Sequence, residues 1–287
     1  MAPPRLSIVI PSHSRVEYLK ECLESLALHR PFDCEVMVID DASNRGAVSQ
    51  IAVQYPFVHV VRLSTRSGFC VASNIGIELA QGEIVELLND DTAVSPGWAE
   101  PALTQFEKSN VVAVAPLVMQ WGEENRIDSA GDDYDYGGFA KKRGHGLHPN
   151  EFELRAGPVW GVNATAGFYR RSALIDAGLF PTDFGAYFED VDLAHRLRTL
   201  GEIRFEPSSV VRHRISSSYG AQPSAPVLEQ QSCNEERVFW RNVKGWNRLR
   251  NLPRHFAVLI GKAMRRLKEG NFGPWSRGRL RAWLGVG

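Results

Sequence analysis

Short apolar stretches alternate with helical patterns through the first 118 residues, and this alternation limits the fold more than any other feature of the chain. After residue 15, the residues Leu19, Cys22, Leu23 and Leu26 fall on one face of an expected helix. Buried strands are expected at Leu6–Ile10, Glu35–Ile39, His59–Leu63, Glu83–Leu88 and Val111–Ala115. The pattern predicts an α/β fold with a doubly wound, mainly parallel, Rossmann-like sheet.

Acidic residues follow two of these strands directly. Asp40 and Asp41 come after the second strand, and Asn89, Asp90 and Asp91 come after the fourth. Ligands of doubly wound sheets bind beyond the carboxyl ends of the strands, where carboxylates suit Mg²⁺ or Mn²⁺. The alternative is an Asx-type turn, in which the same side chains accept hydrogen bonds from nearby backbone N–H groups. The residues alone leave both interpretations open.

Two later features carry possible chemistry. Glu189, Asp190 and Asp192 open a helix expected at residues 190–200, where acids are also favoured by the helix dipole. His213 lies in the strand-like stretch Val210–Arg214. A lone histidine is usually packed or solvated, so these residues by themselves fit a structural role as well as a catalytic one.

The segment 120–158 changes character and predicts a long exposed loop or an irregular hairpin. Its part Asp132–Gly146, together with Trp121 and Trp160, is a candidate for selecting a ligand. A surface loop and core packing are the alternatives for these residues. Ser216–Pro226 is rich in Ser, Pro and Gly and predicts a linker.

The balanced charge of 33 basic and 33 acidic residues conceals a basic tail. From Arg237 onward there are thirteen Lys/Arg and one acid, which leaves 20 basic and 32 acidic residues before it. Arg254–Lys268 alternates apolar and basic residues at helical spacing, as does an amphipathic helix at an anionic membrane surface. The alternative is a helix packed on the acidic body. No nucleic-acid recognition motif accompanies the charge, so nucleic acid is not an expected partner.

The cysteines and the apolar segments indicate where in the cell the protein is located. Cys22, Cys34, Cys70 and Cys233 have neither C-x-x-C nor metal-ligand spacing, which indicates reduced thiols in a cytoplasmic protein. The apolar run Leu6–Ile10 is too short for a signal peptide, and no stretch approaches the roughly 20 apolar residues of a membrane span. With the basic tail, this predicts a peripheral protein on the cytoplasmic face of the cell membrane.

The order of these pieces resembles glycosyltransferase family 2, which has the A-type fold, and within it the bacterial rhamnosyltransferase-type members that build cell-surface polysaccharide. The matching segments are Leu6–Arg15, Val38–Ser43, Gly68-Phe69, Asn74–Gly76, Ala80–Glu83, Leu87–Thr92, Phe168–Arg171, Phe188–Leu193, and His213 with Ser216 and Ser218. Each motif is weak alone, whereas the ordered set is specific. The resemblance covers roughly residues 5–218 and implies a catalytic domain at 1–218, with a donor-binding half at about 1–118 and an acceptor-binding half at 119–218. Residues 219–287 are then a linker and a basic amphipathic helical tail.

The resemblance also implies donor-binding roles. Pro11 and Ser12 would line the nucleotide pocket, Asp40 or Asp41 would hydrogen-bond the base and ribose, Asn74 would shape the pocket wall, and Arg15 would contact the donor. Arg66 stands where many members carry Asn, so the donor-side loop is expected to make contacts of its own.

The metal and catalytic residues are implied in the same way. Asn89-Asp90-Asp91 matches the family's D-x-D position, with Asp91 on Mn²⁺ or Mg²⁺ and Asp90 near the ribose and diphosphate. Asn89 departs from the motif and removes one charge. Asp190 would be the general base, with Glu189 beside it, and His213 a further metal or diphosphate contact.

These roles predict a metal-dependent, inverting transfer of a sugar to a hydroxyl of a glycan or polyprenyl-linked acceptor. The ligand that Asp132–Gly146, Trp121 and Trp160 would select is then the acceptor. The family expectation for the donor is a dTDP- or UDP-linked sugar, with rhamnose first. The main alternative is a non-catalytic nucleotide- or membrane-binding module. A dinucleotide oxidoreductase would carry G-x-G-x-x-G after the first strand, and a sugar nucleotidyltransferase a Gly-rich loop there, but residues 11–15 contain no glycine.

Overall fold

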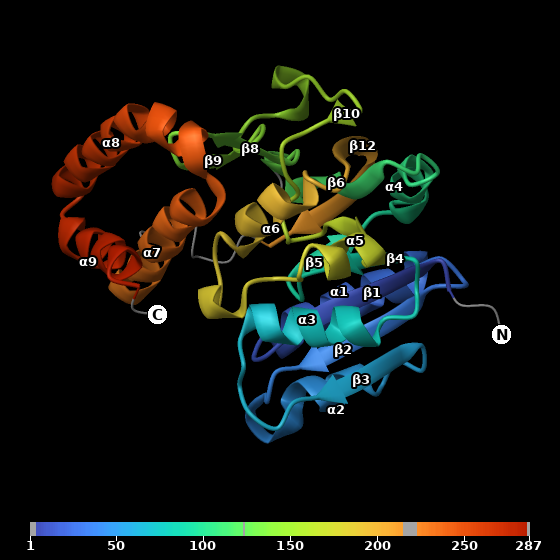
Figure 1. Ribbon diagram of the computed structural model, residues 1–287. Coiled ribbons are helices and arrows are strands. Elements are labelled where there is room, and N and C mark those ends of the chain that lie inside the picture. The colour runs from blue at the N-terminus through green and yellow to red at the C-terminus, as the bar shows by residue number, and fades with distance from the viewer. Residues whose placement is uncertain (1–3, 123, 215–222, 286–287) are drawn as a thin grey trace.

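The computed structural model describes residues 4–122, 124–214 and 223–285 (Figure 1). Within this part of the chain, ten strands form one sheet and two more form a hairpin. The strands are β1 (Leu6–Ser12), β2 (Glu35–Asp40), β3 (Val58–Arg62), β4 (Ile84–Leu87), β5 (Thr92–Val94), β6 (Val111–Gln120), β7 (Ile127–Ser129), β8 (Asp132–Asp135), β9 (Phe139–Lys142), β10 (Gly157–Pro158), β11 (Phe168–Arg170) and β12 (Glu202–His213).

The main path of the sheet runs β10-β12-β6-β11-β4-β1-β2-β3. The long ladders, β1 with β2 and β4, β2 with β3, and β6 with β12, are parallel. β11 is antiparallel to both of its neighbours, β4 and β6, and therefore joins two parallel halves. In the half of the sheet that contains β6 and β12, called the outer half, β5 pairs with β12 and β7 pairs with β6. The expected doubly wound, mainly parallel sheet is confirmed.

Helices cover both faces of the sheet. They are α1 (Val16–His29), α2 (Ala47–Ala52), α3 (Phe69–Leu79), α4 (Ala99–Gln105), α5 (Arg171–Asp176) and α6 (Glu189–Leu197). One apolar core lies under α1, α2 and α4, and a second lies under α3, α5 and α6. Side chains of a strand point alternately to the two faces, so Ile8 joins the first core and Val9 the second.

The segment 120–158 is more ordered than expected from its sequence. It contains β7, the β8–β9 hairpin and a short turn of helix at Pro149–Glu151. Val111 begins a strand that extends to Gln120, and the expected strand near residue 210 is the end of the long β12. Between residues 159 and 170, the strand is Phe168–Arg170, and Gly161 forms an isolated bridge with Asp132.

The C-terminal region is helical: α7 (Ala225–Asn242), α8 (Gly245–Lys268) and α9 (Phe272–Trp283). Figure 1 shows these helices grouped on one side of the molecule, next to the β8–β9 hairpin. Leu228, Leu259 and Trp275 form a small core between them. Most of the expected linker lies outside the described residues, as do Ser216 and Ser218, and Ala225 already belongs to α7. None of the described helices has both the length and the apolar character needed to cross a membrane.

Candidate functional site

The carboxyl ends of β1, β2 and β4 meet at one edge of the sheet. Ser12 at the end of β1 is in register with Asp40 at the end of β2, and the chain after β4 turns away through Asn89. The hydroxyl of Ser12 donates to Oδ2 of Asp90 across 2.7 Å. Burial raises the pKa of Asp90 to about 6, with the neighbouring Asp91 charge adding to the effect. Two predicted donor residues, Ser12 and Asp90, therefore lie in direct contact.

Asp91 lies between a cation and a histidine. Arg15, after β1, forms an ion pair with Oδ2 of Asp91. Oδ1 of Asp91 is buried, lies 3.3 Å from Nε2 of His213 at the end of β12, and has no other partner among the described residues. β5 is antiparallel to β12, which places Thr92 opposite His213 and brings Asp91 next to it. The two residues predicted as metal ligands from distant parts of the sequence are thus neighbours.

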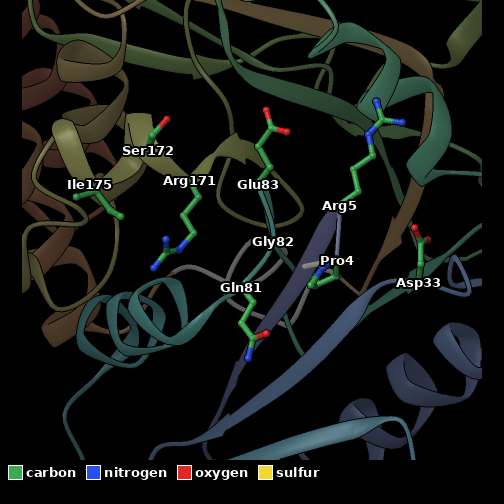
Figure 2. A pocket seen from close by; sticks show the side chains of 9 residues that line it. All are labelled: Pro4, Arg5, Asp33, Gln81, Gly82, Glu83, Arg171, Ser172 and Ile175. Carbon is green, nitrogen blue, oxygen red and sulfur yellow. The ribbon is translucent and has the colours of Figure 1, made fainter. Parts of the chain in front are cut away.

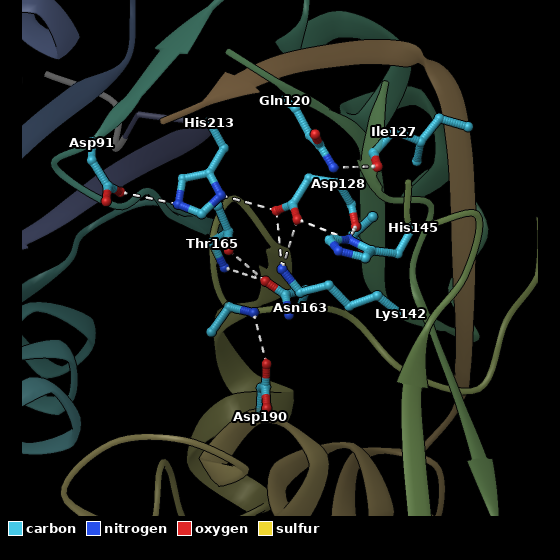
Figure 3. Close-up of polar contacts among 12 residues, drawn as sticks. Asp91, Gln120, Ile127, Asp128, Lys142, His145, Asn163, Thr165, Asp190 and His213 are labelled. Atoms are coloured by element: carbon cyan, nitrogen blue, oxygen red, sulfur yellow. Dashed lines mark hydrogen bonds and ion pairs between the residues drawn. The ribbon is translucent and has the colours of Figure 1, made fainter. Parts of the chain in front are cut away.

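A residue that the sequence analysis missed holds His213 in this orientation (Figure 3). Oδ2 of Asp128, in β7, lies 2.9 Å from Nδ1 of His213. Lys142 Nζ donates to both carboxylate oxygens of Asp128 at 3.0 Å, and His145 Nδ1 lies 3.2 Å from Oδ1. Burial alone would raise the pKa of Asp128, but hydrogen bonds from His145 and His213 and the Lys142 charge hold it well below its ordinary value. Asp128 lies in a segment expected to be loop, and no sequence signal marks it.

This arrangement suits a divalent cation. A carboxylate that accepts the Nδ1–H of a histidine fixes its tautomer and presents Nε2 to a metal. Nε2 of His213 faces Oδ1 of Asp91, which has no other partner among the described residues, so a buried oxygen and a nitrogen lie side by side. Among the described residues, no group of three or more His, Cys, Asp or Glu side chains forms a complete cage. Mg²⁺-type sites commonly take their remaining ligands from substrate phosphates and water.

The first turn of α6 carries Glu189 and Asp190. Oδ2 of Asp190 accepts from the backbone N–H of Ala164 at 3.2 Å, and Oδ1 accepts from Val191 N–H at 2.8 Å. Figure 3 shows the segment with Asn163 and Thr165 between His213 and Asp190. In the same segment, the carbonyl oxygen of Thr165 accepts a hydrogen bond of 2.9 Å from the backbone N–H of Asn89. One short segment therefore contacts both the Asn89–Asp91 loop and the proposed base.

The carboxyl groups of this turn hold their protons more tightly than free carboxyls. Burial raises the pKa of Glu189 to about 8, and the Asp190 charge adds to the effect. Burial also raises the pKa of Asp190, although backbone N–H groups of Ala164 and Val191 oppose the shift. A raised pKa makes a carboxylate a better proton acceptor.

The carboxylates of Asp40 and Asp41 both accept hydrogen bonds from backbone N–H groups. Asp40 accepts from Ser43 N–H at 2.7 Å and from Ser49 N–H at 3.2 Å, and it forms an ion pair with Arg62 at 3.2 Å. Asp41 accepts from the N–H groups of residues 67 and 68 at 2.6 and 2.8 Å. Asp40 therefore satisfies nearby backbone N–H groups, as the turn interpretation expected, whereas Asp41 holds the loop before α3, 26 and 27 positions further along the chain. The role of both residues toward base and ribose stays a prediction.

The other predicted donor residues lie around this edge. Pro11 is buried in β1 opposite Ile39, and Arg66 is exposed on the loop before α3. Asn74 in α3 exchanges two hydrogen bonds of 2.9 Å with the backbone of Phe180, so it ties the helix to the segment that leads to α6. These positions are compatible with a pocket wall but do not bring the three residues together.

A cavity of about 550 Å³ lies at the opposite edge of the sheet (Figure 2). Its lining includes Arg5 before β1, Glu83 before β4 and Arg171 at the start of α5. The two guanidinium groups donate to the backbone carbonyls of Leu103 and Ile77. This cavity is separate from the acidic strand ends and does not belong to the site described above.

A doubly wound sheet with helices on both faces and acidic strand ends is the architecture of A-type glycosyltransferase folds. The chain belongs to the glycosyl transferase family 2, whose sequence pattern it matches over residues 7–178. It is similar to the uncharacterized glycosyltransferase YwdF of Bacillus subtilis, with 28% identity over 123 residues. That match covers 42% of this chain and 45% of the relative, so the chain spans less than half the length of YwdF.

Solved structures share the fold. A mannosyltransferase from Pyrobaculum calidifontis, in complex with GDP-Man and Mn²⁺, matches 99% of this chain and 88% of its own, with a TM-score of 0.64 and 17% identity. GalNAc-T7 with UDP, GalNAc and Mn²⁺ matches 83% of this chain and 48% of its own, also with a TM-score of 0.64 and with 21% identity. The predicted A-type fold with a helical C-terminal extension is confirmed.

Proposed function

We propose that the chain transfers a sugar from a nucleotide-diphospho-sugar to an acceptor hydroxyl in a metal-dependent reaction with inversion. The observation that carries this proposal is the pair of buried atoms, Asp91 Oδ1 and His213 Nε2, 3.3 Å apart beside the strand ends. Two solved proteins of the same fold contain Mn²⁺ together with a nucleotide or nucleotide-sugar. Asp91 and His213 would hold Mn²⁺ or Mg²⁺ in this chain, with diphosphate oxygens and water completing the coordination.

The residues next to Asp91 then form the donor side. Asp90, whose carboxylate accepts a hydrogen bond from the Ser12 hydroxyl, would face the ribose and diphosphate. Arg15 has a partly exposed side chain beside Asp91, so its guanidinium is available to the charge of the diphosphate. When bound, the divalent cation supplies a Lewis acid for the charge that grows on the leaving nucleoside diphosphate.

Asp190 is proposed as the general base that accepts the proton of the attacking hydroxyl. Its two oxygens accept backbone hydrogen bonds that orient the carboxylate, and its raised pKa increases its basicity. Burial and the charge of Asp190 raise the pKa of Glu189, which favours its neutral form and reduces the negative charge beside the base. A single base and a single displacement give inversion at the anomeric carbon.

The finer assignment follows the family resemblance. We propose a dTDP- or UDP-linked donor, with rhamnose as the first choice, and a glycan or polyprenyl-linked acceptor in cell-surface polysaccharide synthesis. Residues 1–118 would bind the donor and residues 119–218 the acceptor, on the cytoplasmic face of the cell membrane.

A panel of nucleotide-sugars tests the proposal. In the presence of Mn²⁺, the correct donor should raise the melting temperature, since a ligand at about 100 times its Kd stabilises a protein by about 2.7 kcal/mol. The same donor should then be consumed when acceptor is added, and EDTA should stop its consumption until Mn²⁺ or Mg²⁺ is restored. Donor binding without any turnover would favour the non-catalytic module, and turnover that survives thorough chelation would remove the metal from the mechanism.

A further inference from the structure

One face of α8 exposes a row of large apolar side chains that the fold does not use. The exposed fractions are 78% for Trp246, 59% for Leu249, 52% for Phe256, 62% for Ile260, 57% for Met264 and 60% for Leu267. Steps of three, four and seven residues keep these side chains on one side of a helix. We call these six residues the α8 stripe. Exposed apolar surface that is continuous over several turns marks an interaction site more often than scattered single residues do.

The α8 stripe is not the face by which α8 packs on the rest of the protein. That face carries His255, which hydrogen-bonds Gly137 O at 2.8 Å and Glu236 Oε1 at 3.0 Å, and Leu259, which is buried between α7 and α9. Arg254 forms an ion pair with Asp135 of the β8–β9 hairpin. The helix is therefore already anchored to the body, and the stripe remains on its free side.

The charges of the tail are divided in the same way. Lys262, which is partly buried, and Arg279, which is buried, form ion pairs with Glu235 and Glu236 of α7. By contrast, Arg250 and Lys268 are exposed, four residues after Trp246 and Met264 respectively, which places them beside the stripe. Residues 245–283 contain ten Lys/Arg and a single acid, Glu269. The free side of α8 thus combines apolar side chains with positive charge.

The combination of apolar side chains and positive charge on α8 indicates which kind of partner fits this surface. A second copy of the chain would bring two positively charged faces together, which like charges oppose. An apolar row flanked by cations instead fits a surface that offers hydrocarbon beneath a layer of anions. We propose that the α8 stripe, flanked by Arg250 and Lys268, is the surface by which this protein lies on an anionic lipid bilayer. The proposal is independent of sugar transfer and requires no nucleotide.

Co-sedimentation of the full-length chain with vesicles tests it. The vesicles are phosphatidylcholine alone or with about one-third phosphatidylglycerol, whose charge attracts Lys and Arg near the surface. The wild-type chain should partition onto the anionic vesicles, and less so as salt is raised. The double variant Ile260→Gln, Met264→Gln should lose on the order of tenfold or more of this binding, because it removes apolar area from the stripe. Its melting temperature should be unchanged, since both side chains are exposed.

Two further variants separate the contributions. The matched control Leu28→Gln, Phe32→Gln removes side chains that are 77% and 98% exposed but lie in the last turn of α1 and just after it, and it should bind as the wild type does. Arg250→Gln, Lys268→Gln should weaken binding to anionic vesicles and leave the weak binding to neutral vesicles unchanged. Wild-type binding by the folded stripe variant would overturn the proposal. So would a lipid-free dimer that the same variant dissociates, because the stripe would then be an interface between copies.

Discussion

Oδ2 of Asp128 lies 2.9 Å from Nδ1 of His213, although 85 positions separate the two residues in the chain. Through this contact, the β7 strand determines which nitrogen of His213 faces Asp91. The carboxylate of Asp128 is itself held by Lys142 and His145, so the orientation of a proposed metal ligand depends on the β8–β9 hairpin and the segment that follows it. Asp128 is a positioning residue in this arrangement, because it acts through His213.

Replacing Asp128 tests that role. Asp128→Asn should lower Mn²⁺ affinity about 10- to 100-fold, because the amide no longer fixes the histidine tautomer as a carboxylate does. Isothermal titration calorimetry of Mn²⁺ in the absence of sugar nucleotide measures this directly. Asp133→Asn is the matched control, since Asp133 lies on the neighbouring hairpin and pairs only at 3.7 Å with Lys141 and Arg143. If folded Asp128→Asn binds Mn²⁺ as the wild type does, the positioning role is wrong.

Replacing Asp190 separates binding from chemistry. Asp190→Asn should keep donor binding, because Asp190 lies on α6 and not on the Asn89–Asp91 loop, and should lower the transfer rate by about 10²- to 10⁴-fold. In the wild type, the rate should rise as the pH increases through the raised pKa of the base, because only the carboxylate accepts a proton. The control is Asp176→Asn at the exposed end of α5. Full transfer activity in Asp190→Asn would exclude Asp190 as the base.

Glu86 provides a prediction about stability and pH. Its side chain is fully buried in β4, its hydrogen bonds come from Trp98 Nε1 at 3.0 and 3.2 Å, and burial raises its pKa well above the ordinary value. In the unfolded state Glu86 loses its proton above a pKa of about 4.3, whereas the folded state keeps the proton to higher pH. The folded state therefore binds more protons, and the free energy of unfolding falls as pH rises, by up to about 1.4 kcal/mol per pH unit. Glu86→Gln cannot ionise and should become more stable relative to the wild type as pH increases.

Urea unfolding at several pH values between the ordinary and the raised pKa of Glu86 measures the difference. Glu107→Gln, at an exposed position after α4, should leave the pH dependence of the wild type unchanged. A constant difference in stability between Glu86→Gln and the wild type across the range would contradict the prediction.

Replacing Gly76 or Gly261 by alanine should change the free energy of unfolding in opposite directions. A Cβ at Gly76 in α3 would lie 2.2 Å from Cγ1 of Val9 and 3.2 Å from Cγ1 of Ile39, so Gly76→Ala should cost about 1–3 kcal/mol through overpacking. A Cβ at Gly261 in α8 meets nothing within 4 Å, and Gly261→Ala should stabilise the chain by about 0.5–1 kcal/mol. Chemical unfolding of both variants compares them. Equal effects would mean that α3 does not approach the sheet as closely as described.

The sequence predicted the inner half of the sheet well because each strand there is a short apolar run and each helix has one apolar face. In the half that contains β6 and β12, it predicted the start of β6 and the end of β12 but missed the short strands. β11 is three residues long and lies antiparallel between β4 and β6, and β5 has only the three residues Thr92–Val94. Such short strands are defined by their partners, and little in their own residues distinguishes them from loop.

The sequence likewise predicted some residues of the candidate site and missed others. Asp90 and Asp91 could be chosen from the sequence because they follow a buried strand, and Ser12 because the family resemblance implies it. The structure brings these residues together with His213. Asp128 could not be chosen, because its importance comes from a contact across 85 residues.

The tail shows the same division in its charges. Its basic composition and helical spacing are evident in the sequence, but the sequence does not indicate which cations are already neutralised. The structure pairs Lys262 and Arg279 with Glu235 and Glu236, and it leaves Arg250 and Lys268 beside the exposed stripe. The sequence by itself therefore determined the strand and helix pattern, the family and the acidic strand ends, since these depend on residues close together in the chain. Only the tertiary structure decided which distant charges meet, because an ion pair depends on distance in space.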